Sequence, residues 1–223
     1  MDIASSIAYC DETGGDYYDF LKGDGSDQGK FAVVVGDVSG HGISAALLMA
    51  SVRAFLRQRS ALSGSIAQIV ADVNRLLALD VEDSGGFMTL FYLSIDIAKR
   101  QLNWVRAGHE PAIFYDPATD TFEELRGKGT ALGVNADAHY LENEKGYLTE
   151  GQIILLGTDG LWEARNPAGE MFGKEPIYRL IRENPAASAR EILTSCFDAL
   201  NMFLENQSPD DDITLVVIKV RDL

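Results

Sequence analysis

Apolar positions along the chain recur in two periods, one typical of helices and one typical of strands. Between residues 43 and 59 they recur every three or four positions, which predicts a helix. This apolar stripe comprises Ile43, Leu47, Leu48, Val52, Phe55 and Leu56. A second stripe begins after Ser65, a residue that can cap the first turn of a helix. It comprises Ile66, Ile69, Val70, Val73, Leu76 and Leu77. We expect both helices to cover a sheet.

Strand signals come in two groups, separated by these helices. The run from Phe31 to Val35 is continuously apolar and predicts a buried strand that ends at Gly36-Asp37. After the helices, apolar and polar positions alternate, which predicts a strand with one apolar face. The residues on that face are Phe87, Thr89, Phe91, Leu93, Ile95 and Ile97. Lys99-Arg100 predicts a turn into the next strand, so we expect a hairpin.

Shorter segments complete the pattern. Apolar runs predict strands at residues 3–9, 112–115, 121–125, 152–156 and 213–220, and helical periods cover 174–183 and 188–204. Strands in groups and helices in groups favour an α+β fold over alternating βαβ units. We therefore predict two packed, mainly antiparallel sheets with helices on the outside.

Charge and cysteine content narrow the classes of function. The net charge of −15 argues against binding to nucleic acid or to an anionic membrane, because both require a cationic surface. No apolar run reaches the length of a membrane span. Cys10 and Cys196 lack the short spacing of a zinc site, and we interpret them as reduced cysteines of a cytoplasmic protein.

The aspartates carry the most informative pattern. Asp37 and Asp159 each follow an apolar strand, Asp211 and Asp212 precede another, and Asp16 follows two glycines. Each of these alone is typical of a turn or a solvated loop. Together they indicate that rigid strands deliver several carboxylates to strand ends, which is a suitable place for a site.

Carboxylates gathered at one end of a core repel each other, and a divalent cation removes that repulsion. Ligation by oxygen alone suits Mg²⁺ or Mn²⁺, whereas zinc favours His or Cys. Four carboxylates suffice for two ions held about 3.5–4 Å apart, an arrangement that activates water and clamps a phosphoryl oxygen. Residue chemistry alone therefore favours metal-assisted phosphoester hydrolysis.

Five motifs in register add a resemblance to a known family. They are GGDYYDF at 14–20, GDVSGHG at 36–42, AGH at 107–109, TDGLWEA at 158–164 and DDITLV at 211–216. In this order they closely resemble the PPM family of metal-dependent protein phosphatases. Within it, the match is to the bacterial sporulation and stress-response branch (SpoIIE-like, RsbU-like). The resemblance runs from about Ile7 to Val220, nearly the whole chain.

The resemblance implies a central β-sandwich in α-β-β-α layers, with a dimetal site at one edge. By position, Asp37 is the carboxylate that bridges both metals, and the Val38 carbonyl is a further ligand. Asp16 is implied to hold the second metal, and Asp159 and Asp211 the first. The implied cofactors are two divalent cations, Mn²⁺ or Mg²⁺, with a weak third metal in some members.

Several assignments stay open under this resemblance. Asp212 adjoins Asp211, so a shift of one position is an alternative. Glu163 resembles the acidic position that some members use for the third metal. Ser39 stands where the eukaryotic branch has its proposed general acid, which leaves His41 as either a proton donor or a loop residue. His109 is interpreted as a residue that orients a loop.

The implied function is hydrolysis of phosphoserine or phosphothreonine on a bacterial regulatory protein, of the anti-anti-sigma-factor type, by direct attack of a water that bridges the two metals. Residues 1–223 then form a single catalytic domain, the C-terminal part of a longer signalling protein with an upstream sensor or receiver domain. Two alternatives are a phosphatase-like regulatory module that binds without turnover and a metal-dependent phosphoesterase for small molecules. Presence of all four aspartates favours the enzyme.

Overall fold

A computed structural model describes residues 1–10, 12–22, 29–205 and 207–221. The chain divides into two compact units, and each contains one five-stranded sheet in the described residues. Unit 1 comprises Met1–Glu12, Ala112–Leu125 and Thr149–Leu223, and unit 2 comprises Thr13–Pro111 and Arg126–Leu148.

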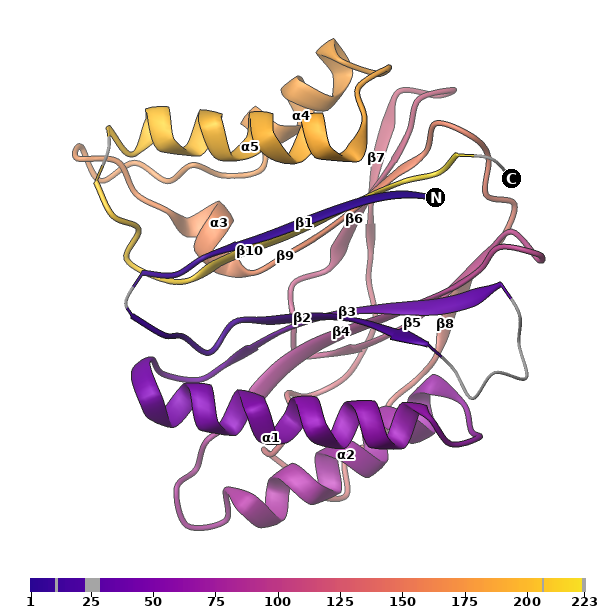
Figure 1. Ribbon diagram of the computed structural model, residues 1–223, viewed down its shortest axis with the longest axis vertical. Coiled ribbons are helices and arrows are strands. Elements are labelled where there is room, and N and C mark those ends of the chain that lie inside the picture. The colour runs from indigo at the N-terminus through magenta and orange to yellow at the C-terminus, as the bar shows by residue number, and fades with distance from the viewer. Residues whose placement is uncertain (11, 23–28, 206, 222–223) are drawn as a thin grey trace. The chain divides into compact units, whose positions relative to one another are not determined.

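The sheet of unit 1 is antiparallel throughout, in the order β1-β10-β9-β6-β7. Its strands are β1 (Asp2–Ala8), β6 (Ala112–Asp116), β7 (Thr121–Leu125), β9 (Ile153–Gly157) and β10 (Ile213–Lys219). Its helices are α3 (Asp159–Glu163), α4 (Glu175–Glu183) and α5 (Ala189–Phe203). Figure 1 shows α5 running along β1 and β10. Every residue of β10 is buried, and Ile213, Leu215 and Val217 pack in the unit's hydrophobic cluster with side chains of α5.

The sheet of unit 2 is also antiparallel, in the order β2-β3-β4-β5-β8. Its strands are β2 (Tyr17–Lys22), β3 (Lys30–Val38), β4 (Met88–Asp96), β5 (Gln101–Ala107) and β8 (Asn143–Lys145). Helices α1 (Gly42–Ser60) and α2 (Ile66–Asp80) lie beside this sheet (Figure 1).

Strand alternation in unit 2 separates a core face from the face that carries the candidate chemistry. Ala32, Val34 and Val38 of β3 pack in one hydrophobic cluster with side chains of α1 and α2. Because successive strand residues point to opposite faces, Asp37 lies on the face of the sheet away from the two helices.

These elements confirm the predicted α+β class, with two antiparallel sheets and flanking helices in the part of the chain described. The predicted cap of α2 is also confirmed, because the Ser65 hydroxyl accepts a hydrogen bond from the Gln68 amide at 3.2 Å. The Gln68 side chain returns one from the Ser65 amide at 3.0 Å, which completes a capping box. None of the described helices is long and apolar enough to cross a membrane.

The predicted stripe of α1 was wrong in part. Ile43 is 74% exposed and Leu47 is 66% exposed, whereas Val52 and Leu56 are fully buried. Apolar residues surround the first half of this helix, so their spacing does not define a single buried face.

Several strand boundaries also differ from the prediction. Strand β3 continues through Asp37 to Val38 because Asp37 pairs with Thr89 of β4, so Asp37 lies within the strand rather than after it. Residues predicted at strand ends that lie just outside the observed strands are Tyr9, Phe87, Ile97, Gln152 and Val220. The short strand β8 was not predicted, since its three residues are polar.

A substitution pair on α1 tests which face is buried. We expect Leu56→Ala to lower the free energy of unfolding by about 2–5 kcal/mol, because it removes core atoms and leaves a cavity. Leu47→Ala, the same change on an exposed position of the same helix, should alter it by less than about 0.5 kcal/mol. Urea denaturation measures both, and equal effects would contradict this assignment of faces.

Candidate metal centre

Antiparallel pairing places Asp16 opposite Asp37 in unit 2. The register of β2 and β3 pairs Tyr17 with Gly36, and the Val38 amide donates a hydrogen bond to the Gly15 carbonyl at 3.4 Å. The intervening pair in this register is Asp16 and Asp37. Residues directly opposite on neighbouring strands share one face, so both carboxylates leave the sheet on the face away from α1 and α2.

Glycine at position 15 makes this pairing possible. A Cβ atom there would lie 2.8 Å from the Val38 carbonyl oxygen and 3.1 Å from the Val38 Cβ, closer than real Cβ contacts allow. The backbone of the Gly-Gly-Asp segment therefore lies directly against the end of β3. Asp16 is 2% exposed, so its carboxylate is held in a buried place.

Thr89 and His109 extend this end of unit 2. The Thr89 hydroxyl lies 3.4 Å from the Asp37 carbonyl oxygen, to which it donates, and 2.8 Å from Nδ1 of His109. His109 is 3% exposed and follows Gly108, whose φ is +71°. Thr89 was predicted only as part of a strand face and not as a site residue, although it faces Asp37 in the strand pairing. Its contacts connect His109 to the backbone of the predicted bridging ligand, consistent with an orienting role.

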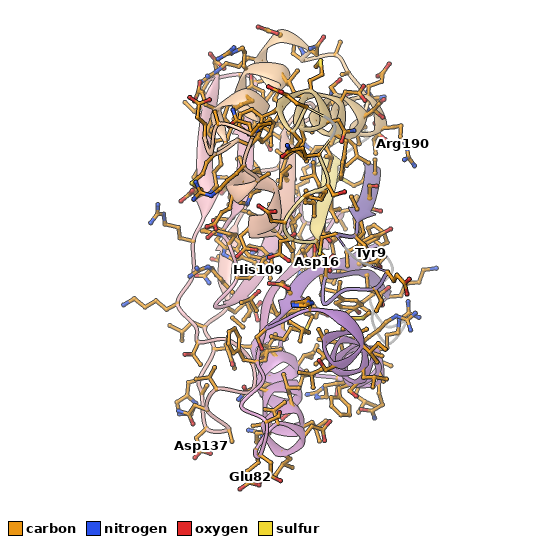
Figure 2. The ribbon with its side chains drawn as sticks, turned by 90° about the vertical axis from the view of Figure 1, so that its left-hand side faces the viewer. Tyr9, Asp16, Glu82, His109, Asp137 and Arg190 are labelled. Carbon is orange, nitrogen blue, oxygen red and sulfur yellow. The ribbon has the colours of Figure 1, made fainter. Side chains whose placement is uncertain are left out.

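Two acidic residues of unit 2, Glu82 and Asp137, lie away from this end. Figure 2 shows both at the opposite end of the unit from Asp16 and His109. Asp137 is exposed, so it provides a control position far from the Asp16–Asp37 pair.

In unit 1, β9 and β10 bring Asp159 to the same end as Asp211 and Asp212. The Thr158 amide donates to the Thr214 carbonyl at 3.2 Å, and the Thr214 amide donates to the Thr158 hydroxyl at 2.9 Å. The chain then enters α3 at Asp159. Because β10 is antiparallel to β9 and begins just after Asp212, the acidic residues of both segments adjoin this end.

A close approach of backbone again requires glycine. A Cβ atom on Gly160 would lie 2.1 Å from the Asp212 carbonyl oxygen. The Asp-Gly sequence that follows β9 therefore reflects contact between two backbone segments as well as a turn.

Asp211 and Asp212 differ in their surroundings. Asp212 is buried, and its Oδ1 accepts a hydrogen bond from the Cys10 amide at 3.0 Å. The pKa of the Cys10 thiol is raised to about 11. The largest cause is burial, followed by the hydrogen bond with Asp212 and by the negative charge of Asp212. Asp211 is exposed, and its Oδ1 accepts from the next amide at 2.8 Å. The side chain of Asp212 thus serves to attach residue 10 to the start of β10.

The auxiliary candidates occupy exposed positions. Glu163 is exposed at the last residue of α3. His41 is exposed at the N-cap of α1, where its side chain makes no cap hydrogen bond. Ser39 is engaged with Phe87, whose amide donates to the Ser39 hydroxyl at 3.0 Å.

The oxygen donors in unit 2 fit a hard divalent cation. Two carboxylates opposite each other, one of them buried, repel unless a cation or a proton neutralises them. In residues 1–10, 12–22, 29–205 and 207–221, no three His, Cys, Asp or Glu side chains form a group that could hold a metal ion. Asp16 and Asp37 belong to unit 2, and Asp159 and Asp211 belong to unit 1. Their joint ligation of two ions therefore stays a prediction.

Solved structures share this architecture. The SiaA-PP2C domain of Pseudomonas aeruginosa is similar with a TM-score of 0.85 and 23% identity, over 98% of this chain and 86% of that one. A structure of the RsbU and RsbW domains of Rv1364c from Mycobacterium tuberculosis is similar with a TM-score of 0.78 and 28% identity. The match covers 99% of this chain and 60% of that one. RsbX in complex with magnesium is similar with a TM-score of 0.66 and 17% identity, over 97% of this chain and 94% of that one. The fold is that of the PP2C-type phosphatases.

Sequence comparison makes the assignment more specific. The family described as "Stage II sporulation protein E (SpoIIE)" matches residues 27–221, and this chain belongs to it. Phosphoserine phosphatase RsbU of Bacillus subtilis is 31% identical over 98% of this chain and 63% of its own length. Phosphoserine phosphatase RsbP of the same organism is 24% identical over 94% of this chain and 50% of its own length. The resemblance stated from the motifs is confirmed, and the chain spans less than two thirds of these relatives.

The contact of Gly15 with Val38 can be tested directly. We expect Gly15→Ala to lower the free energy of unfolding by about 1–3 kcal/mol, because the added methyl group forces the two backbone segments apart. The Val38 amide should then exchange its hydrogen faster. Gly146→Ala is the control, since a Cβ there meets nothing within 4 Å and should leave both quantities unchanged. Wild-type exchange at Val38 in Gly15→Ala would contradict the pairing.

Proposed function

We propose that this chain is a metal-dependent protein phosphatase that hydrolyses phosphoserine or phosphothreonine on a bacterial regulatory protein. Membership of the SpoIIE family and similarity to two phosphoserine phosphatases support the reaction class. The observation that carries the proposal is the pairing of Asp16 with Asp37 at the end of β2 and β3. It provides adjacent carboxylates on a rigid sheet, as a divalent cation requires.

We assign each proposed metal-ligand role to one residue. Asp37 would serve both ions, Asp16 the second, and Asp159 and Asp211 the first, and the Val38 carbonyl would be a further ligand. We propose two divalent cations, Mg²⁺ or Mn²⁺, and the similar RsbX structure, which is in complex with magnesium, supports the choice of a divalent metal. When bound, the cations supply Lewis acidity that lowers the pKa of water and stabilises charge on the phosphoryl group.

The surroundings of the other candidates separate their roles. We propose Asp211 rather than Asp212 as the ligand, because Asp212 is buried and accepts the Cys10 amide. Glu163 is exposed and remains a candidate for a third, weak metal. His41 is exposed at the start of α1, where its side chain makes no cap hydrogen bond, so it is retained as a candidate proton donor.

The proposed substrate is a phosphorylated protein of the anti-anti-sigma type. A similar solved structure contains RsbU and RsbW domains, which supports a place in this kind of regulation. We propose that residues 1–223 form one catalytic domain, joined in the longer protein to a sensor or receiver domain. The relatives are longer than this chain, which is consistent with such additions. We propose that it acts in the cytoplasm, where its two cysteines stay reduced, and the net charge of −15 argues against nucleic acid or an anionic membrane as its target.

The central test is hydrolysis of an aryl phosphate with Mn²⁺. Asp37→Asn should lower the rate by about 100-fold or more, because the change removes the charge shared by both ions. A chelator should abolish the wild-type rate. Asp137→Asn, at the far end of unit 2 in Figure 2, is the matched control and should stay within about twofold of wild type.

Hydrolysis that persists with chelator, or an Asp37→Asn protein as active as wild type, would overturn the mechanism. Comparable specificity for nucleotides and phosphopeptides would instead favour a small-molecule phosphoesterase. A folded protein that binds Mn²⁺ but hydrolyses neither class would favour the binding module.

The neighbouring aspartates of β10 provide a second test. We expect Asp211→Asn to weaken Mn²⁺ binding by about 10- to 100-fold. Asp212→Asn should retain Mn²⁺ affinity within about twofold, because an amide oxygen still accepts the Cys10 hydrogen bond. Calorimetric titration of the metal-free proteins measures both. The reverse result would assign the ligand to Asp212.

A further inference from the structure

Strand β2 is an edge strand, and its placement decides where Asp16 lies. In the described sheet of unit 2, β2 pairs with β3 alone. Asp16 immediately precedes its first residue, Tyr17. An edge strand lacks a second neighbour to hold it, so contacts with other elements must limit its movement.

The contact that holds β2 to α1 is a buried carboxylate, Asp19. Arg57 of α1 donates two hydrogen bonds to it, from Nε to Oδ2 at 2.6 Å and from Nη2 to Oδ1 at 2.7 Å. The Tyr17 hydroxyl donates to Oδ2 at 2.9 Å. Asp19 is 8% exposed, whereas the Arg57 side chain is half-exposed, so the carboxylate is shielded from water and the guanidinium covers it from the solvent side. Paired hydrogen bonds between a guanidinium and a carboxylate fix orientation as well as distance.

The charge of Asp19 is favoured by these partners. Burial opposes ionisation of the carboxyl group, but the hydrogen bonds from Arg57 and Tyr17 outweigh it. The pKa of Asp19 is therefore lowered from its ordinary value. Arg53, one turn earlier on α1, adds a more distant contact, with its Nε 3.7 Å from Oδ2. Both oxygens of the carboxylate are thus engaged.

This network fixes the strand that follows Asp16. Asp19 follows Asp16 by three residues, about 10 Å along an extended strand. Arg57 lies near the C-terminal end of α1, so its bonds to Asp19 attach β2 to the helix and not to the end of β3. Asp16 is therefore held opposite Asp37 by strand pairing, and the strand that carries it onwards is held by α1.

We propose that Asp19, with Arg57 and Tyr17, is a positioning residue for the metal ligand Asp16. It lies on the face of β2 that packs towards α1, because Asp19 pairs with Val34 of the helix-facing core. It does not contact the metal itself. This inference rests on the proposed metal-dependent function, and it predicts that metal affinity depends on a carboxylate that binds no metal.

A second ion pair of α1 supplies a matched control. Arg59 Nε donates to Asp72 Oδ2 at 2.6 Å and joins α1 to α2. This pair involves an arginine and an aspartate like Asp19–Arg57, yet it touches neither β2 nor β3. A purely structural role for Asp19 predicts that neither Asp19→Asn nor Asp72→Asn changes the Mn²⁺ affinity of the folded protein.

The experiment compares Asp19→Asn, Arg57→Lys and Asp72→Asn as metal-free proteins titrated calorimetrically with Mn²⁺. We expect the first two to bind Mn²⁺ about 10- to 100-fold more weakly than wild type. Lysine keeps the charge but cannot form the paired hydrogen bonds, so Arg57→Lys tests orientation, and it decides the question if Asp19→Asn does not fold. Asp72→Asn should stay within about twofold of wild type. In the absence of metal, the backbone amides of β2 should exchange hydrogen faster than in wild type in Asp19→Asn and Arg57→Lys, but not in Asp72→Asn.

At saturating Mn²⁺, kcat of Asp19→Asn and Arg57→Lys should recover to within about threefold of wild type, because the ligands themselves are intact. Wild-type Mn²⁺ affinity in the folded variants, or an equal loss in Asp72→Asn, would overturn the positioning role. Asp37→Asn separates this failure from that of the proposed function. If wild type and Asp37→Asn both fail to bind Mn²⁺, or bind it equally, the metal site itself is wrong. If only Asp37→Asn loses binding, the site stands and the role of Asp19 is refuted.

Discussion

The contact between the backbone of Gly15 and the end of β3 is the constraint on which the candidate site of unit 2 depends. It extends the β2–β3 register by two residues beyond Tyr17 and Gly36. Two carboxylates then stand opposite each other at a place where the strand cannot easily move. The divalent cation proposed for this site would offset the repulsion between them.

Local signals account for the parts of the fold that were predictable. The capping box of α2 and the turn at Lys99-Arg100 each lie within a few residues, so the sequence displays them directly. Which residues of α1 are buried was harder to predict. Ile43 and Leu47 are as apolar as Leu56, and only the position of the sheet decides which of them meets the core. Strand β8 has no apolar pattern, because it is defined by backbone pairing with β5.

For the site, the motifs predict Asp16 and Asp37 as metal ligands, and that role stays a prediction. The opposition of the two residues depends on a strand register that no local pattern encodes. Asp19 and Arg57 were overlooked because 38 positions separate them. A usable signal does exist, since Asp19 occupies an inward position of an apolar strand. Arginines one turn apart on the following helix, Arg53 and Arg57, offer its charge a partner.

The pairing of β1 with β10 has a consequence for the order of folding. Strand β10 hydrogen-bonds with both β1 and β9, and the Met1 amino group reaches the Arg221 carbonyl across 220 positions. During synthesis, β1 must therefore wait for nearly the whole chain before its neighbour exists. Contacts this distant in sequence slow folding, although the entropy of closing so long a loop grows only logarithmically with its length. The hairpins of unit 2 carry no such delay, so its strands can pair while the first strand of unit 1 still lacks a partner.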